Sequence, residues 1–281
     1  MYSHMKSQIK KCGLPLNPPS FKGRFHPNFP HPSLVKKISA CDLLFRDPDC
    51  QILLNGRNRV GRLRFALDNG QMIDVVVKEF NAQGLDRLKT LFFPSKAQKA
   101  WRGGLILEQR DIPTPDPVAF LEKERKPFIN QSFYFSLFLK GAEEIRPLFR
   151  QLADQELRRL LQSLAHHLSS CHDKSILHRD LSDGNILVRM NADQEYAFFL
   201  IDTNRARLKR RMGTLRRIKS LIRLGVPPNL QRFFLEEYLG SPQIKNLVWV
   251  WYKLNKNAYT GYVHLKRKLR IRYFIQKLGI Q

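Results

Sequence analysis

The chain has 281 residues, of which 43% are hydrophobic, so it is long and apolar enough to build a sizeable core, and disorder throughout is excluded. Its apolar stretches fall short of the roughly 18 to 20 residues that cross a bilayer, and its first residues lack the apolar segment of a secretory signal. We therefore expect a cytoplasmic protein. The four cysteines form no C-x-x-C pair, which favours free thiols over a disulfide framework or a zinc site.

The net charge of +25 is concentrated at the two ends of the chain. Residues 1–40 contain seven Lys or Arg and no acidic residue, and residues 203–281 contain nineteen basic residues against two acidic ones. This segregation predicts two basic surfaces that attract a polyanion, whether phosphate-rich lipid, nucleic acid or an anionic membrane. The alternative is charge that serves solubility alone, although surfaces of mixed sign are the ordinary solution to that problem.

The first half of the chain is predicted to be mostly β. Residues 1–34 alternate prolines and polar residues without a period, so we predict a basic, mobile or loosely docked arm that builds no core. The β-branched run IDVVVKEF at residues 73–80 predicts a buried or half-buried strand. Residues 95–110 predict a helix with Ser95 as its N-cap, ended by the prolines of residues 112–117.

The second half is predicted to be mostly helical. A strand at residues 133–139 is followed by KGAEE at residues 140–144, where we place a hinge. From Asp154 onward, leucines up to Leu168 recur at helical spacing, and two later strands flank a polar turn at residues 191–196. We therefore predict an α+β fold with an arm at residues 1–34, a small and mostly β lobe at residues 35–139, and a mostly α lobe at residues 140–281.

The segment HRDLSDGN at residues 178–185 carries the clearest chemical signal. His178, Arg179, Asp180 and Asn185 fill every fixed position of H-R-D-x-x-x-x-N, the catalytic loop of kinases. Asp180 can orient a substrate hydroxyl and accept its proton while the bond to phosphorus forms. Asn185 offers Mg²⁺ a neutral oxygen that adds no charge repulsion beside the carboxylate. The loop predicts phosphoryl transfer from ATP with Mg²⁺.

Asp202 is the second candidate metal ligand, because it ends an apolar strand seventeen residues after Asn185 and a hairpin between them would bring it to the catalytic loop. Protein kinases have D-F-G here, whereas this chain has Asp202, Thr203 and Asn204. Taken alone, the carboxylate could equally be a strand-end cap.

Lys78 lies inside the strand at residues 73–80, where kinases keep the lysine that contacts the α- and β-phosphates. An ammonium group on the inner face of such a strand is costly unless an anion meets it, and a solvated outer face is the alternative. Glu108 is the only acid of the neighbouring predicted helix and is therefore the candidate partner. No G-x-G-x-x-G is present, so Gly56 and Gly61 are the candidates for a phosphate-binding turn, although a plain turn between strands explains them equally well.

On these residues the chain resembles the lipopolysaccharide kinase family, bacterial enzymes that phosphorylate heptose or Kdo sugars of the inner core. The resemblance covers roughly residues 50–240 and is carried by VVVKEF, the block at residues 95–122, HRDLSDGNIL and LIDTNRARL. It implies a protein-kinase-like bilobed fold, Lys78 for ATP, Asp180 as base, and Asn185 with Asp202 for Mg²⁺. Some relatives carry a glutamate near the position of Ala100, so the resemblance gives Lys78 no clear ion-pair partner.

The sequence after Asp202 favours an acceptor other than protein. Only 79 residues follow, they contain no A-P-E, and basic helical runs begin soon. The stretch at residues 261–280 mixes apolar and basic residues, as expected of a helix at an anionic membrane surface or of a last core helix with a solvated basic face. Nucleic-acid binding is not favoured, because no aromatic stacking motif or zinc spacing accompanies the charge.

Three hypotheses result from the sequence. The leading one is a cytoplasmic kinase, peripheral to the inner membrane, that phosphorylates a lipid-linked saccharide of the lipopolysaccharide core. An atypical protein kinase is the first rival, because RIO-type kinases also have a serine at the position of Ser182. The second rival is a non-catalytic pseudokinase that binds a polyanion. The sequence predicts no oligomeric state.

Overall fold

The structure is a computed structural model that describes residues 12–18, 20–29, 31–56, 58–125, 127–242 and 244–277. The chain folds into two compact units, of which the first combines residues 1–143 with residues 199–210. The second combines residues 144–198 with residues 211–281. The chain therefore leaves the first unit, builds part of the second, and returns to the first for a short segment.

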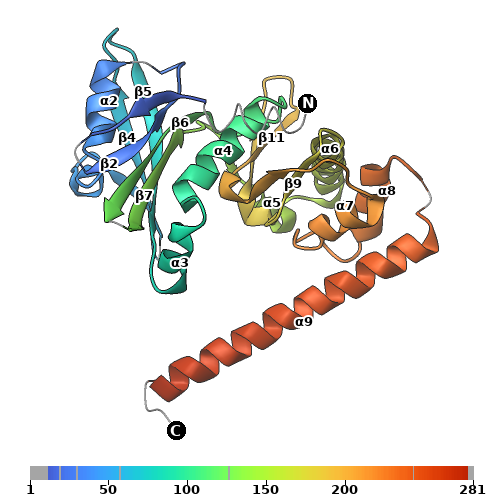
Figure 1. The fold of residues 1–281 in the computed structure, drawn as a ribbon. Coiled ribbons are helices and arrows are strands. Elements are labelled where there is room, and N and C mark those ends of the chain that lie inside the picture. The colour runs from blue at the N-terminus through green and yellow to red at the C-terminus, as the bar shows by residue number, and fades with distance from the viewer. Residues whose placement is uncertain are drawn as a thin grey trace. The chain divides into compact units, whose positions relative to one another are not determined.

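The first unit is built on one antiparallel sheet with the strand order β1-β2-β6-β7-β5-β4-β3 (Figure 1). Its strands are β1 (Leu14–Leu16), β2 (Phe21–Phe25), β3 (Gln51–Asn55), β4 (Asn58–Ala66), β5 (Met72–Asn81), β6 (Pro117–Arg125) and β7 (Phe128–Leu137). The strand predicted at residues 73–80 is confirmed as β5. The strand predicted at residues 133–139 corresponds to the second half of β7, which begins five residues earlier and ends at Leu137.

The helices of this unit are α2 (Pro32–Ser39), η1 (Leu44–Arg46), α3 (Leu85–Leu88), η2 (Lys89–Leu91) and α4 (Lys96–Glu108). The helix predicted at residues 95–110 is confirmed as α4. Its N-cap is Ser95, whose Oγ accepts a hydrogen bond from the backbone N–H of Gln98 at 3.0 Å, and this bond satisfies a donor that the first helical turn leaves open.

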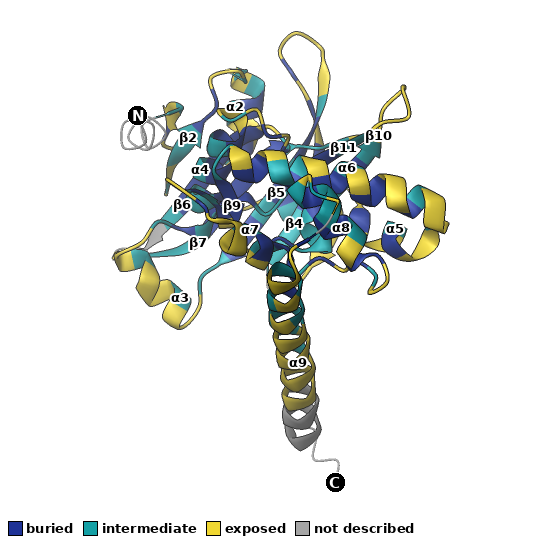
Figure 2. Ribbon diagram, turned by 90° about the vertical axis from the view of Figure 1, so that its right-hand side faces the viewer, coloured by how far each residue is buried: buried dark blue, intermediate teal, exposed yellow. Residues whose placement is uncertain are grey.

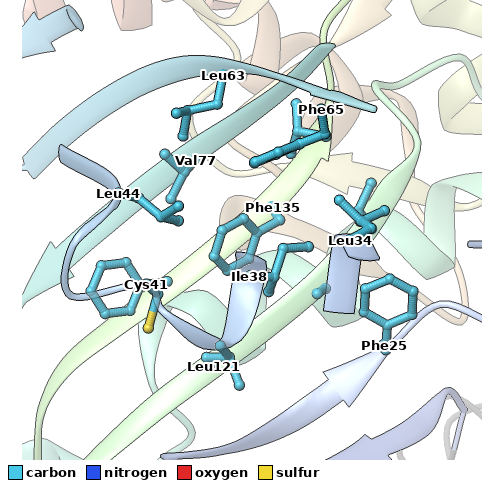
Figure 3. Packing of buried hydrophobic residues seen from close by; sticks show 14 of the residues in the cluster. Phe25, Leu34, Ile38, Cys41, Leu44, Leu63, Phe65, Val77, Leu121 and Phe135 are labelled. Atoms are coloured by element: carbon cyan, nitrogen blue, oxygen red, sulfur yellow. The ribbon is translucent and has the colours of Figure 1, made fainter. Parts of the chain in front are cut away.

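The two faces of the sheet bury different sets of side chains because residues along a strand alternate in direction. On one face, Val75 and Val77 of β5 join the main core, in which Leu34 and Ile38 of α2 also pack (Figure 3). On the other face, Phe80 packs with α4 in a second cluster that includes Trp101. Lys78 shares the parity of Phe80 and therefore lies on the α4 face of the sheet.

The prediction of a coreless arm at residues 1–34 is wrong for the part of this segment that the structure describes. Leu16, Phe25 and Leu34 are buried in the main core, and β2 pairs with β6 along its whole length. The prolines concealed this pattern, since Pro15 lies on β1, an edge strand where a missing N–H is tolerated, and Pro32 begins α2. Residues 1–11 lie outside the described residues.

The second unit is mostly helical. Its helices are α5 (Ile145–Gln151), α6 (Asp154–Asp173), α7 (Thr214–Leu221), α8 (Gln231–Leu239) and α9 (Asn246–Lys277). Its short strands are β9 (Ile176–His178) and β10 (Ile186–Met190), and β10 pairs with β11 (Tyr196–Leu200) across the predicted turn at residues 191–196. Of the shorter elements, η3 (Asp183–Asn185) belongs to this unit and β8 (Glu143–Glu144) lies at its first residue. The other two, η4 (Thr203–Arg205) and β12 (Ala206–Leu208), belong to the first unit.

Helix α6 confirms the predicted amphipathic helix. The six residues at helical spacing are all buried, namely Leu157, Leu160, Leu161, Leu164, Ala165 and Leu168. Helix α6 packs against α8. A buried hydrogen bond of 2.6 Å between His172 Nδ1 and the hydroxyl of Tyr238 joins these two helices, and burial lowers the pKa of His172 to about 4.

Helix α9 is held to the second unit by its first half. Tyr252 is buried, and Lys256 donates hydrogen bonds to the carbonyl oxygens of Ile222 and Leu224 at 2.8 and 2.5 Å. Farther along, Tyr262, Leu265 and Leu269 are exposed, as the yellow part of α9 in Figure 2 shows. Neither α9 nor any other helix within the described ranges is both long and apolar enough to cross a membrane.

The burial of Leu34 gives a direct test of the revised N-terminal region. We expect Leu34→Ala to lower the free energy of unfolding by about 2–5 kcal/mol, because it leaves a cavity in a closed core. Leu43→Ala is the matched control, since Leu43 lies nearby but is 58% exposed, and it should change stability by no more than about 0.5 kcal/mol. Urea denaturation measures both. Equal effects of the two substitutions would contradict the packing described above.

Candidate active site

The first unit brings Lys78 and Asp202 together. Lys78 Nζ donates to Asp202 Oδ1 at 2.5 Å, and the two side chains retain 28% and 22% of their exposure. An ammonium group on the inner face of a strand is unfavourable unless an opposite charge meets it, and the Asp202 carboxylate supplies that charge. Both side chains remain accessible enough to meet a ligand.

Asp202 has an unusual backbone conformation. It follows β11 with φ of 57° and ψ of 44°, in the left-handed region that only Gly, Asn and Asp enter readily. Its carbonyl oxygen accepts a hydrogen bond of 3.0 Å from the N–H of Arg205, which closes the turn of η4. The turn directs the Asp202 side chain toward β5, and a larger or β-branched residue would fit the turn poorly.

The segment around Asp202 is anchored to two other parts of the first unit. Before it, Leu200 donates its N–H to the carbonyl of Pro113 at 3.0 Å and accepts a hydrogen bond of 2.8 Å from the hydroxyl of Thr114. After it, the buried hydroxyl of Thr203 donates to the carbonyl of Ala100 in α4 at 2.8 Å. The IPTPDP segment, which the sequence shows only as a helix stop, therefore also positions the end of β11.

Gly103 allows this close approach. A Cβ atom on Gly103 would lie only 1.9 Å from the carbonyl oxygen of Thr203, far inside any real contact. A glycine within a helix normally costs about 1 kcal/mol relative to alanine, so its presence in α4 is explained by the backbone that lies against it. Helix α4 and η4 therefore form one rigid support for Asp202.

The catalytic loop lies in the second unit and is closed by its own hydrogen bonds. The carbonyl oxygen of Asp180 accepts from the N–H of Ser182 at 2.9 Å and from the side-chain amide of Asn185 at 2.7 Å. Because the Asn185 nitrogen is engaged in this way, its amide oxygen is the atom left to coordinate a cation. His178 is buried, as expected of a packing residue, and Arg179 is exposed.

Two arginines of the second unit support this loop, and the sequence reasoning missed both. Arg223 Nη1 donates to Asp180 Oδ1. Arg146 of α5 donates to Asp183 at 3.1 Å, and its guanidinium occupies the space that a Cβ on Gly184 would need. The only sequence signal for these contacts is the basic run that contains Arg223, because no spacing pattern links Arg146 or Arg223 to the catalytic loop.

The residues that the sequence nominated for Mg²⁺ fit this ion in type. Asp202 and Asn185 offer a carboxylate and an amide oxygen, hard donors of the kind that Mg²⁺ prefers. Mg²⁺ needs few protein ligands, since it keeps several waters and is commonly shared with substrate phosphates. Within the described ranges, no cluster of three or more His, Cys, Asp or Glu residues suits a metal bound by protein alone.

The prediction of Glu108 as the partner of Lys78 is wrong. Glu108 ends α4 and lies 3.3 Å from His26 Nε2, while Lys78 pairs with Asp202. Ala100 is buried and has no acidic side chain to offer, and its backbone carbonyl oxygen accepts the hydrogen bond from Thr203. The true partner lies 124 residues away along the chain, and no local spacing reveals it.

The two candidate glycines of the phosphate-binding turn lie in different settings. Gly56 lies between β3 and β4, and a Cβ atom added to it would meet nothing within 4 Å. Gly61 lies inside β4, opposite Val77 of β5, where a Cβ would meet the sulfur of Cys50 at 2.7 Å. Packing against Cys50 therefore explains Gly61, which belongs to the strand ladder and not to a turn, so the prediction fails for this residue.

Comparison with known proteins agrees with these features. The model of the lipopolysaccharide kinase (Kdo/WaaP) family matches residues 76–233, more than half of the chain. A solved structure described as WaaP in complex with acyl carrier protein has 17% sequence identity and a TM-score of 0.53, with 74% of this chain and 88% of that chain covered. At this identity the structural likeness shows the fold alone. No curated protein sequence matches the chain.

The match includes the part of β5 that carries Lys78, α4, the catalytic loop and the Asp202 turn. It places the chain in the class of kinases, phosphotransferases of mixed α and β structure. The chain belongs to the lipopolysaccharide kinase (Kdo/WaaP) family.

The contact between α4 and η4 can be tested with alanine at Gly103. We expect Gly103→Ala to lower the free energy of unfolding by about 1–3 kcal/mol, since the clash with Thr203 outweighs the gain in helix propensity. Gly261→Ala in α9 is the control, because its new Cβ would meet nothing within 4 Å, and it should be neutral or stabilising by up to about 1 kcal/mol. Thermal and urea denaturation report both values. A stabilising effect at Gly103 would contradict the described contact.

Proposed function

We propose that the chain is an ATP-dependent kinase that phosphorylates a sugar hydroxyl, of heptose or Kdo, in the lipopolysaccharide core at the cytoplasmic face of the inner membrane. Membership of the family supports a lipopolysaccharide kinase. The main structural support for an ATP site is the pairing of Lys78 with Asp202. A cation suited to phosphate and a carboxylate suited to Mg²⁺ lie side by side, and both are partly exposed.

We assign one role to each residue of the site. Bound ATP and Mg²⁺ would supply the electrophilic phosphoryl group, and the ion would be held by Asp202 and Asn185. Lys78 would exchange its contact with Asp202 for the α- and β-phosphates. Asp180 would orient the acceptor hydroxyl and accept its proton. Arg223 donates to Oδ1 of Asp180 and holds the carboxylate in place, and Oδ2 would accept the hydrogen bond from the acceptor hydroxyl.

The chain after Asp202 supports a saccharide acceptor over a protein. Strand β12 ends at Leu208 and α7 begins at Thr214, so only residues 209–213 connect them. Protein kinases carry the activation loop and A-P-E between the metal-binding Asp and the following helices. The short connection leaves no room for such a segment.

The kinase proposal is tested by following label from γ-labelled ATP into lipopolysaccharide precursors or into protein extract. We expect label in the glycolipid, and we expect Asp180→Asn to lower the rate about 10²- to 10⁴-fold, the usual contribution of a general base. Asp202→Asn should also abolish transfer, and asparagine keeps the left-handed backbone conformation. Asp193→Asn, in the exposed turn before β11, is the control and should retain full activity.

Each other outcome has a definite meaning. Label in protein alone would favour the protein-kinase rival. Equal and negligible labelling by the wild type and Asp180→Asn would favour the pseudokinase. Because the solved WaaP structure is a complex with acyl carrier protein, each assay is run with and without that protein.

We further propose that the outer half of α9 docks on an anionic membrane. Tyr262, Leu265 and Leu269 recur at a spacing that puts them on one side of the helix, and all three are exposed. Residues 266–268 between them are Lys, Arg and Lys, and each is exposed. An exposed apolar stripe next to basic residues suits the interface of a bilayer that contains anionic lipid.

Binding to lipid vesicles tests this surface. Each basic residue near an anionic surface adds about 1 kcal/mol, so replacing Lys266, Arg267 and Lys268 by Gln should weaken binding to phosphatidylglycerol vesicles roughly 100-fold. Replacing Arg158, Arg159 and Arg232 by Gln removes the same charge from exposed positions on α6 and α8 and should leave binding unchanged. Equal binding by the two triple variants in a sedimentation assay would refute the role of α9.

A further inference from the structure

A second basic feature of the second unit lies beside the catalytic loop. It is a cavity of about 200 Å³, lined in part by His178, Arg179, Arg216, Lys219 and Arg223. This volume is far more than the ~10–15 Å³ that holds one water molecule. Four of these five side chains carry a permanent positive charge, and no acidic residue lines the cavity.

Helix α7 sorts its basic residues between two environments. Arg216, Lys219 and Arg223 are spaced so that they share one side of the helix and of the turn that follows it, and all three face the cavity. Arg217 points elsewhere and pairs with Asp173 at 2.5 Å. Within the part of the chain that the structure describes, no ion pair includes Arg179, Arg216 or Lys219. The cavity therefore has an uncompensated positive charge.

Arg223 joins this charge to the reaction site. Its guanidinium contacts Asp180 and also lies over the ring of Tyr259 in α9, with 5.3 Å between the guanidinium carbon and the ring centre. A ligand in the cavity that contacts Arg223 would therefore be separated from the proposed base, Asp180, by this one side chain. Arginine is well suited to planar, bidentate recognition of carboxylate and phosphate.

We propose that this cavity binds a negatively charged group, a phosphate or a carboxylate, on the acceptor saccharide and thereby places the acceptor hydroxyl at Asp180. This inference rests on the proposed function, whose acceptor it makes more specific. Anion binding offsets the repulsion among the four cations, and an anion that shares the Arg223 guanidinium with Asp180 would hold the acceptor next to that carboxylate. Arg179, Arg216 and Lys219 are thus assigned to acceptor recognition.

The test uses the full chain with Arg216→Gln and Lys219→Gln combined, because both residues are exposed and the fold should be retained. We expect the KM for lipopolysaccharide acceptor to rise at least about tenfold, since charge-assisted hydrogen bonds are lost, with kcat and the KM for ATP unchanged. The control combines Arg158→Gln with Arg232→Gln, which removes the same charge outside the cavity and should leave all three constants unchanged.

Modified acceptors identify the anion. Intact, dephosphorylated and carboxyl-reduced lipopolysaccharide are compared with the wild type and with the cavity variant. Loss of the recognised group should raise the wild-type KM to the level of the variant, and it should leave the KM of the variant unchanged. An unchanged KM in the variant, or a rise in the KM for ATP instead, would overturn the proposal.

A readout without catalysis separates this inference from the proposed function. Inorganic phosphate should raise the Tm of the wild type and of the control variant but not that of the cavity variant. If no acceptor is phosphorylated and this difference in Tm persists, the kinase proposal fails while anion binding by the cavity is supported. If the enzyme is active and phosphate raises the Tm of all three proteins equally, the cavity proposal is wrong.

Discussion

The contact between the backbone of Thr203 and Gly103 of α4 is the constraint on which the ATP site of this chain depends. It brings the turn after β11 against α4, the helix that packs on the face of the sheet that holds Lys78, and the hydrogen bond from Thr203 to Ala100 fixes the turn on that helix. The left-handed backbone at Asp202 then turns the carboxylate onto the lysine. One close packing contact therefore positions a charged pair that lies 124 residues apart in the sequence.

Both carboxylates that we assign to the reaction pair with a cationic side chain of the protein itself. Asp202 has Lys78, and Asp180 has Arg223. Every one of these four side chains is between one-fifth and two-fifths exposed, so solvent screens both pairs and keeps their net stabilisation small. Pairs of this kind hold their side chains in place at little cost to a ligand that replaces one partner. The cavity beside Arg223 differs, because no acidic residue lines it and its other basic side chains have no carboxylate partner there. A bound anion would supply the missing negative charge.

Local patterns in the sequence predicted the local structure well. The spacing of the α6 leucines, the Ser95 cap and the β-branched run around Lys78 each depend on near neighbours, and all are confirmed. The failures have a common physical cause. The partner of Lys78, the burial of Phe25 and Leu34, and the packing of Gly61 against Cys50 are set by contacts between different elements of the fold, which the local pattern around each residue does not contain. The roles of Asp180, Asn185 and Asp202 in catalysis and metal binding stay predictions from the motif.

The return of residues 199–210 to the first unit also has a consequence for folding during synthesis. A ribosome adds about 5–20 residues per second, so residues 144–198 delay that return by roughly 3 to 11 seconds after the sheet has emerged. During this interval Gly103 lacks its contact with the Thr203 backbone, and Lys78 lacks its ion pair with Asp202. The nascent first unit is therefore incomplete until the second is under way, and a fragment that ends at residue 143 would remain in this unfinished state.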